Sequence, residues 1–321
     1  MTRKPDIDAG ATEALLRKAF GSALPITFHR TPDGVSTQVY RVRRGREVFY
    51  LHIAEQAGEN LEAEAELHRR LRDLGVKLAG IVHVDPFNAD IGRSTMITTE
   101  VAGVSLARIT DPAVAVPVAE AAGADLAVIN QIPVDGFGFV RRLNRRWPPS
   151  APFPDHQSFL VSHLPRPWPG PLTVLFGQAQ IKTLEDLIGY EREHSRSSAV
   201  LQHGDFDVNP IFCAGGRYTG LIDFGEIRGA EPFFDLGHFR LHDRETYPGS
   251  LLPALLRGYQ RVRSLPADHP EGIRRSAILL GLRQLCGWLG PPRHYPIDSP
   301  PITARAQRIR DLIAEGPSHP S

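Results

Sequence analysis

The sequence has little cysteine and almost no net charge. Its two cysteines, Cys213 and Cys286, are too few for a disulfide framework and have no spacing that is typical of a metal site. The 37 Lys and Arg residues nearly balance the 36 Asp and Glu residues, so no overall charge favours a polyanionic partner. We therefore expect neither nucleic acid nor a membrane as a binding partner.

Long apolar runs are also missing. No uninterrupted run reaches about 18 apolar residues, the length that a membrane span needs, and the first residues, MTRKPDIDAGATEALL, lack the apolar core of a secretion signal. We therefore expect a cytoplasmic protein, in which the cysteines stay reduced. A chain of 321 residues is long enough for one large domain of two lobes without disulfide or metal staples.

The residue pattern predicts a mixture of strands and helices. Residues 26–53 alternate polar and apolar side chains between turn residues, which indicates a meander. Residues 137–181 are rich in Pro and Arg, which predicts either an irregular connector or an elaborated substrate loop. Helical spacing or strand-like runs predict the remaining elements: helices at 11–20, 61–74, 112–129, 184–195, 250–263, 271–288 and 303–314, and strands at 80–85, 95–101, 211–212 and 218–222.

Two aspartates lie in the most informative segment, LQHGDFDVNPIFCAGGRYTGLIDFGEI at 201–227. Asp205 follows His203 and a glycine in a loop, and Asp223 ends a predicted hairpin. Phosphoryl transfer needs such a pair, because one carboxylate orients the attacking hydroxyl and accepts its proton while the other holds a divalent ion on the triphosphate. His203-x-Asp205 and Asp223-Phe-Gly also match the catalytic-loop and metal-binding motifs of kinases.

These motifs resemble those of the aminoglycoside phosphotransferase family of antibiotic and small-metabolite kinases, which have a protein-kinase-like fold. The family writes His-Gly-Asp in its catalytic loop and Ile-Asp-Phe at its metal site, and PFFDLG at 232–237 is similar to its Pro-x-x-Asp-Leu segment. The resemblance implies that Asp205 is the catalytic base, that Asp223 is a metal ligand, and that Asp235 supports the catalytic loop structurally.

The resemblance also implies an α+β fold of two lobes. Residues 1–101 would form a nucleotide-binding lobe with an antiparallel sheet and a helix, and residues 102–321 a mainly helical catalytic and substrate-binding lobe. The phosphate-covering turn of the family is similar to GVSTQVYRV, which implies nucleotide contacts from Ser36 and Thr37. The lobe-linking hinge is similar to ITTEVAG, where the Thr99 carbonyl and the Val101 N–H would pair with the adenine edge.

Two further positions would complete the nucleotide site. Glu64, on the predicted helix over 61–74, stands where the family has the acidic partner of its phosphate-binding lysine, although a solvated acidic helix face is the alternative. The lysine position itself holds His52, which strand alternation can direct at the cleft. Glu64 and the phosphates would raise the pKa of His52, and we expect weaker triphosphate binding than with lysine. Filling the cleft wall is the alternative role for His52.

The catalytic loop departs from the kinase pattern at Pro210, which occupies the place of the metal-binding asparagine. Proline has no side-chain atom that can coordinate Mg²⁺. Asn209, one residue earlier, is the substitute ligand that we assign, and Asp207 or a water are the alternatives.

We therefore expect an enzyme that moves the γ-phosphate of ATP or GTP, with Mg²⁺, to a hydroxyl of a small molecule. Only residues 225–231 separate the Asp223 motif from Pro232, which leaves no evident activation segment and disfavours a protein kinase. Basic residues near the acceptor side disfavour a polycationic aminoglycoside and favour a nucleoside-like, macrolide-like or sugar-containing acceptor, with antibiotic resistance or metabolism as the role. They are Arg141, Arg142, Arg145, Arg146 and Arg166. His52 and Pro210 motivate the alternative of a nucleotide-binding pseudokinase that regulates a partner.

Overall fold

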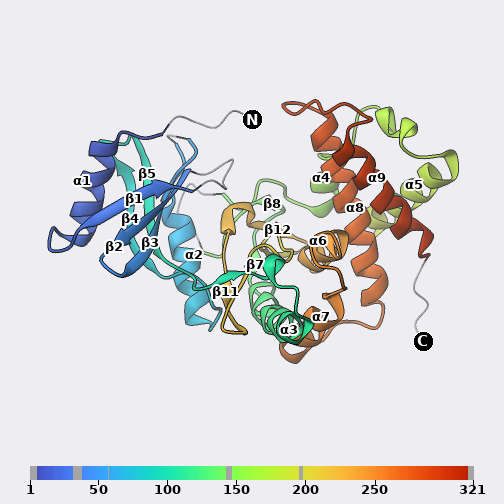
Figure 1. Cartoon of the computed structure of the whole chain (residues 1–321). Coiled ribbons are helices and arrows are strands. Elements are labelled where there is room, and N and C mark those ends of the chain that lie inside the picture. The colour runs from blue at the N-terminus through green and yellow to red at the C-terminus, as the bar shows by residue number, and fades with distance from the viewer. Residues whose placement is uncertain (1–5, 32–37, 57, 142–146, 195–197, 317–321) are drawn as a thin grey trace.

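A five-stranded antiparallel sheet forms the smaller, N-terminal part of the chain (Figure 1). The computed structural model describes residues 6–31, 38–56, 58–141, 147–194 and 198–316. The strands lie in the order β1-β2-β3-β5-β4. Their bounds are β1 (Ile26–Arg30), β2 (Gln38–Arg44), β3 (Glu47–Ile53), β4 (Ile81–Asn88) and β5 (Arg93–Thr99).

Two helices cover this sheet. Helix α1 (Ala9–Phe20) packs Leu15 and Leu16 against Val42 and Leu51, and α2 (Glu62–Asp73) packs Ala65 against Met96. Each fully buried leucine side chain stabilises the fold by about 1.5–3 kcal/mol relative to exposure. The alternation predicted for β3 is confirmed, because its odd-numbered residues from 49 are buried and the even-numbered ones are only partly covered.

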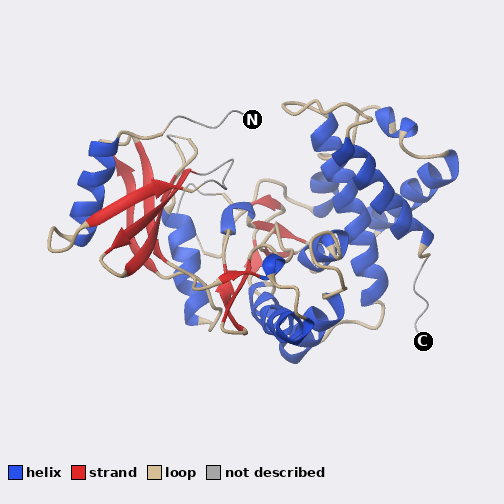
Figure 2. Ribbon diagram, viewed as in Figure 1, coloured by secondary structure: helices blue, strands red, loops and turns tan. Residues whose placement is uncertain are grey.

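The larger part is mainly helical (Figure 2). It contains α3 (Pro112–Ile129), α4 (His156–Val161), α5 (Gln178–Glu193), α6 (Phe234–His242), α7 (Leu252–Val262), α8 (His269–Leu289) and α9 (Pro300–Ala314). Its short strands are β6 (Val104–Ser105), β7 (Pro133–Val134), β8 (Gly138–Phe139), β9 (Ala199–Gln202), β10 (Ile211–Ala214), β11 (Arg217–Leu221) and β12 (Arg228–Ala230). They form the sheets β11-β10-β6 and β7-β9-β12-β8.

One hydrophobic core joins the two parts. Leu67 and Leu71 of α2 and Leu78 after it belong to the same buried cluster as α3, α6 and α8. Leu78 also forms a bridge with Leu221 of β11. The C-terminal half of α2 therefore connects the N-terminal sheet to β11, the strand that precedes Asp223.

Helix α3 is the only helix within the described residues that is long and apolar enough to cross a membrane by length and composition. It packs along α7 and β11, and Val118, Ala122 and Leu126 are buried there. Gly258 of α7 allows this close approach, because a Cβ at that position would lie 1.7 Å from the carbonyl oxygen of Glu120. The apolar composition of α3 is therefore that of a core helix.

The predicted fold class, α+β with an antiparallel N-terminal sheet and a mainly helical C-terminal part, is confirmed. The stretch 137–181 is less irregular than the pattern indicates, since it contains β8, α4 and the start of α5. Helix α5 begins before the predicted helix at 184–195. The pattern missed α6 entirely, because its residues were interpreted only as a sequence motif.

Candidate active site

The loop that follows β9 is held in place by Asp235 at the start of α6. Its carboxylate is fully buried and accepts hydrogen bonds from the backbone N–H groups of His203, at 2.7 Å, and Gly204, at 2.8 Å. The side-chain amide of Asn130 donates a third bond, at 3.4 Å. Burial raises the pKa of Asp235, while His203 and these hydrogen bonds oppose that shift. Asp235 therefore has the contacts of a residue that supports the catalytic loop.

Replacement of Asp235 by Asn should destabilise the protein. An amide offers one acceptor oxygen in place of two, so one buried N–H of the loop loses its partner, which costs about 1–3 kcal/mol. Urea unfolding followed by circular dichroism measures the change, and the exposed Asp311→Asn is the control, expected within about 0.5 kcal/mol of the unaltered protein. An unchanged unfolding midpoint for Asp235→Asn would show that these bonds contribute nothing.

Two features fix the path of the loop before Asp205. Gly204 has φ +91°, and a Cβ there would lie 2.0 Å from the carbonyl oxygen of Glu226, so both conformation and space require glycine. His203 is buried, and its Nε2 lies 2.9 Å from the carbonyl oxygen of Ile222. His203 therefore joins the loop of Asp205 to the strand that precedes Asp223.

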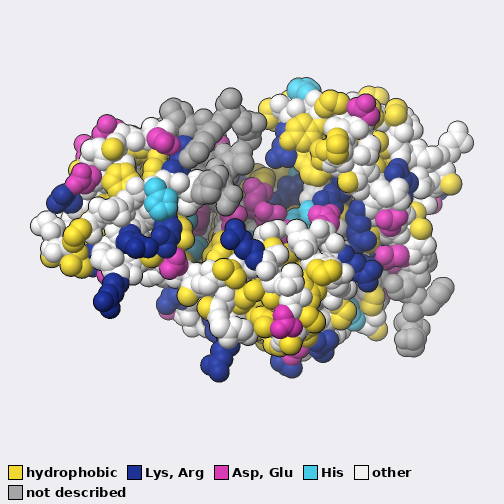
Figure 3. Space-filling view, in the orientation of Figure 1, with side chains coloured by type: hydrophobic (Ala, Val, Ile, Leu, Met, Phe, Trp, Pro, Cys, Tyr) yellow, Lys and Arg dark blue, Asp and Glu magenta, His cyan; other side chains and the backbone are white. Residues whose placement is uncertain are grey.

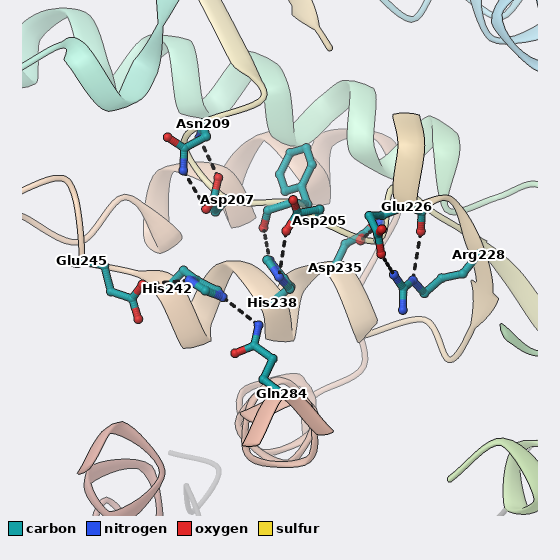
Figure 4. A network of polar contacts seen from close by, with 12 residues as sticks. Asp205, Asp207, Asn209, Glu226, Arg228, Asp235, His238, His242, Glu245 and Gln284 are labelled. Carbon is teal, nitrogen blue, oxygen red and sulfur yellow. Dashed lines mark hydrogen bonds and ion pairs between the residues drawn. The ribbon is translucent and has the colours of Figure 1, made fainter. Parts of the chain in front are cut away.

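Asp205 projects from this loop with its side chain 55% exposed. Partial burial raises the pKa of its carboxyl group, and the nearby carboxylates of Asp207 and Asp223 add to the effect. One carboxyl oxygen lies 3.3 Å from Nε2 of His238 on α6, as Figure 4 shows. The rest of the group is accessible to a reacting hydroxyl.

Asp223 directly follows the β10–β11 hairpin and has φ 64° and ψ 58°. A left-handed aspartate is uncommon and costs about 1–3 kcal/mol of backbone strain, so the surrounding structure must impose it. The next residue, Phe224, is buried and contacts the rings of His203, at 4.9 Å, and His68 of α2, at 5.0 Å. Phe224 therefore anchors the turn and leaves Asp223 exposed beside Asp205.

Asn209 lies in the same loop and is oriented by Asp207. The carboxylate of Asp207 accepts bonds from the backbone N–H of Asn209, at 2.6 Å, and from its side-chain amide, at 2.9 Å (Figure 4). The amide nitrogen is thus engaged, and the amide oxygen remains available as a ligand. Asp207 therefore orients Asn209, whereas the sequence suggested Asp207 only as an alternative metal ligand.

The residues present fit a magnesium ion held jointly by protein and phosphates. Among the described residues there is no group of three or more His, Cys, Asp or Glu side chains that could hold a metal alone. Mg²⁺ commonly uses one or two carboxylates and completes its shell with substrate phosphates and water. The exposed carboxylate of Asp223 and the amide oxygen of Asn209 offer such a partial set of oxygen ligands.

His52 of β3 lies in the N-terminal lobe, close enough to Asp223 for the aspartate to act on its charge. Burial is the main cause that lowers its pKa, whereas Glu64 and Asp223 raise it. Glu64 thus acts on the pKa of His52 in the expected direction, but desolvation outweighs it in the protein without nucleotide. Nε2 of His52 lies 3.3 Å from Oγ1 of Thr98. Glu64 itself is 8% exposed, which contradicts the alternative of a solvated acidic face.

Comparison with known proteins decides the family. A sequence profile described as the phosphotransferase enzyme family, APH, matches residues 27–274. The chain belongs to this phosphotransferase family. A search of curated protein sequences gives no match.

Solved structures show the same fold at low identity. Aminoglycoside phosphotransferase APH(4)-Ia, in a ternary complex with ADP and hygromycin B, has a TM-score of 0.67 at 16% identity, over 96% of this chain and 100% of that chain. The amicoumacin kinase hAmiN, in complex with AMP-PNP, Ca²⁺ and Ami, gives 0.59 at 16% identity, over 95% and 94%. A fructosamine-3-kinase assigned by similarity in Haemophilus somnus gives 0.60 at 13% identity, over 94% and 96%.

In this phosphotransferase the link between the lobes is tightly packed. Thr99 ends β5, and its hydroxyl accepts a bond from the N–H of Gly80, at 2.8 Å. Val101 follows on the way to Gly103, which has φ +102° and would place a Cβ 1.9 Å from the carbonyl oxygen of Cys213. Thr99 and Val101 thus lie on the segment predicted as the hinge. Ser36 and Thr37 lie outside the described residues, as do Arg142, Arg145 and Arg146.

A hollow separates the two lobes, and acidic side chains gather in it (Figure 3). A separate cavity lies in the larger lobe between α4, α6 and α8. Its apolar walls include Phe159, Phe234 and Leu279, and its polar groups include Glu231 and Arg283. Burial lowers the pKa of Arg283 to about 9 and raises that of Glu231, so the cavity holds a partly desolvated cation and carboxyl group.

Arg228 connects this cavity to the catalytic loop. Its Nε lies beside Gly204, since a Cβ there would approach it to 2.7 Å, and its guanidinium covers the Phe234 ring at 4.9 Å. Arg283 approaches the same ring at 5.9 Å. The sequence alone did not indicate His238, Arg228 or Arg283. His238 had a usable signal, because it follows Asp235 at helical spacing in a motif already recognised.

Proposed function

We propose that this protein transfers the γ-phosphate of ATP or GTP to a hydroxyl group of a small molecule. The observation that carries the proposal is the pair of exposed carboxylates, Asp205 and Asp223. The buried rings of His203 and Phe224 contact each other and hold the two carboxylates side by side. ADP in one of the similar structures and AMP-PNP in another support a nucleoside triphosphate as the donor. We propose the cytoplasm as the place where it acts.

Under this proposal each carboxylate has its own task. Asp205 orients the acceptor hydroxyl in line with the γ-phosphorus and takes its proton, and its raised pKa makes it a stronger base than an ordinary aspartate. Asp223 and Asn209 hold Mg²⁺, which neutralises charge on the triphosphate when it is bound. His52 and Glu64 contribute to the nucleotide side, together with Ser36, Thr37, Thr99 and Val101.

The acceptor contacts the larger lobe under this proposal. Residues 225–231 contain β12 and lead directly into α6, so a small molecule fits better than a protein that needs an activation segment. The cavity between α4, α6 and α8, of about 30 Å³, offers apolar walls with a carboxyl group and a guanidinium, so it has room for one polar group of a neutral, hydroxylated acceptor and not for the whole molecule. A nucleoside-like, macrolide-like or sugar-containing antibiotic or metabolite has this chemistry. Resistance by O-phosphorylation is the role that we propose for an antibiotic acceptor.

Arg283→Gln should weaken acceptor binding and leave nucleotide binding intact. Nη1 of Arg283 is buried without a hydrogen-bond partner among the described residues, so a ligand that pairs with it gains a bond to a charged group. Such bonds contribute about 1.5–3 kcal/mol, so the KM for the acceptor should rise about 10- to 100-fold. Steady-state kinetics measure both KM values. The exposed Arg261→Gln is the control, and an equal rise in the KM for ATP would contradict an acceptor-side role.

A panel of hydroxylated acceptors tests the function itself. Each acceptor is incubated with ATP or GTP and Mg²⁺, and mass spectrometry detects the addition of one phosphoryl group. Product with at least one acceptor, absent with Asp205→Ala, supports the proposal.

A regulatory pseudokinase is the second candidate, and two observations favour it. His52, with its pKa lowered, stands in place of lysine, and Pro210 removes the usual metal ligand. Nucleotide binding that needs no magnesium, with no product from any acceptor, would favour this alternative.

A further inference from the structure

His238 is buried in the larger lobe and has both ring nitrogens against oxygen atoms of the catalytic loop. It is 4% exposed and lies on α6, one turn after Asp235. Nε2 lies 3.3 Å from Oδ1 of Asp205, and Nδ1 lies 3.1 Å from the carbonyl oxygen of Phe206 (Figure 4). The same helix that supports the loop through Asp235 therefore also contacts the carboxyl group of Asp205.

The surroundings keep the imidazole of His238 neutral. Burial is the largest cause that lowers its pKa, and three basic groups face it from different elements: His242 of α6, Arg228 of β12 and Arg305 of α9. Among them, the ring of His242 stacks on His238 at 4.5 Å and holds Glu245 on its other side, at 2.8 Å. Asp205 is the carboxylate at the edge of the His238 ring.

A neutral ring has one N–H, and the environment decides which nitrogen carries it. The carbonyl oxygen of Phe206 can only accept a bond, so we assign the proton to Nδ1. Nε2 then has no hydrogen, and its lone pair faces Asp205. Its distance of 3.3 Å is longer than the roughly 2.7–2.9 Å of a charge-assisted bond, as expected when no proton lies between the two atoms.

This arrangement changes when Asp205 takes a proton. The new O–H can donate to Nε2 of His238, whereas the carboxylate gains nothing from a facing lone pair. A hydrogen bond available only to the protonated form raises the pKa of a carboxyl group. His238 therefore favours the state that Asp205 reaches after proton transfer.

We propose that His238 is a positioning residue for Asp205, which fixes one carboxyl oxygen and accepts a hydrogen bond from the proton that Asp205 removes from the acceptor. This inference rests on the proposed role of Asp205 as the base. In the transfer, the O–H bond of the acceptor breaks and its oxygen bonds to the γ-phosphorus. The bond from that phosphorus to the β-phosphate oxygen breaks, and the nucleoside diphosphate leaves with the electron pair. The proton stays between Asp205 and Nε2.

The kinetic test is His238→Asn, which keeps a donor near Nδ1 and removes Nε2. We expect kcat to fall about tenfold, which is less than the full contribution of a general base because Asp205 itself remains. The KM for ATP should not change. The acid limb of the pH profile of kcat should also move to lower pH, because Asp205 loses the group that favours its protonated form. The exposed His194→Asn is the control. A fall in kcat without movement of the limb would indicate a merely structural role and overturn the proposal.

Nuclear magnetic resonance of the unaltered protein with ¹⁵N-labelled histidine tests the same contact without any acceptor. We expect His238, assigned from its loss in His238→Asn, to be the neutral Nδ1–H tautomer well below the ordinary histidine pKa of about 6.5. Its Nε2 signal should shift as Asp205 titrates, and this shift should vanish in Asp205→Ala. The Nε2–H tautomer, or titration near pH 6.5 regardless of Asp205, would overturn the proposal. A protein that shows the pairing but transfers no phosphate would refute the proposed function instead.

Discussion

Asp205→Asn is expected to lower the rate of phosphoryl transfer by about 10²–10⁴-fold, the usual contribution of a positioned general base. The amide has nearly the same shape as the carboxyl group but cannot take the proton of the acceptor hydroxyl. Asp205 is half-exposed and supports no backbone group of the loop through a hydrogen bond in the described structure. Initial rates of ADP formation with a coupled assay measure the loss, and the KM for ATP should not change.

The fold should survive this substitution. Partial burial and neighbouring carboxylates raise the pKa of Asp205, so its charged form opposes folding above that pKa, and removing the charge should leave the free energy of unfolding unchanged or slightly higher. Urea unfolding provides this check. Full activity in Asp205→Asn would eliminate Asp205 as the base, whereas lost activity with lost stability would point to the fold.

Asp223→Asn should have an effect of at least comparable size for a different reason. It weakens the site for Mg²⁺, whose charge stabilisation is worth several kcal/mol, so we expect a loss of about 10³-fold or more in kcat/KM. Asparagine tolerates the left-handed backbone at this position, with φ 64°, better than alanine would. The turn anchored by Phe224 should therefore stay in place.

The two aspartate variants should differ in how magnesium affects nucleotide binding. Calorimetry of ATP binding, with and without Mg²⁺, should show the normal magnesium dependence in Asp205→Asn and a strongly reduced one in Asp223→Asn. If both variants keep the full dependence, Asp223 is not the ligand and the assignment of Asn209 beside it also fails.

The sequence indicated the aspartates of the candidate site but not the groups that surround them. Asp205, Asp223 and Asp235 follow from short motifs, because backbone loops and hairpins dictate their places locally. His52 shows the limit: strand alternation gave its face correctly, but the sign of its pKa shift depends on how deeply the strand is buried. Burial arises from tertiary packing, which one strand cannot reveal.

The groups around Asp205 were the least predictable. His238 and Arg228 come from α6 and β12, elements that the residue pattern did not resolve, and Arg283 comes from α8, far along the chain. Their proximity results from pairing of β12 with β9 and from packing of α6 on α8. Isolated histidines and arginines carry no local signal for such contacts. Only the helical spacing of His238 from Asp235 could have suggested one.

The most direct test of the account is acceptor-dependent release of ADP, measured with and without Mg²⁺ for the unaltered protein, Asp205→Asn and Asp223→Asn. We expect the unaltered protein to release ADP rapidly only when acceptor and Mg²⁺ are both present, and either variant to release little. Equal release by the unaltered protein and Asp205→Asn, or release that is independent of Mg²⁺, would contradict it.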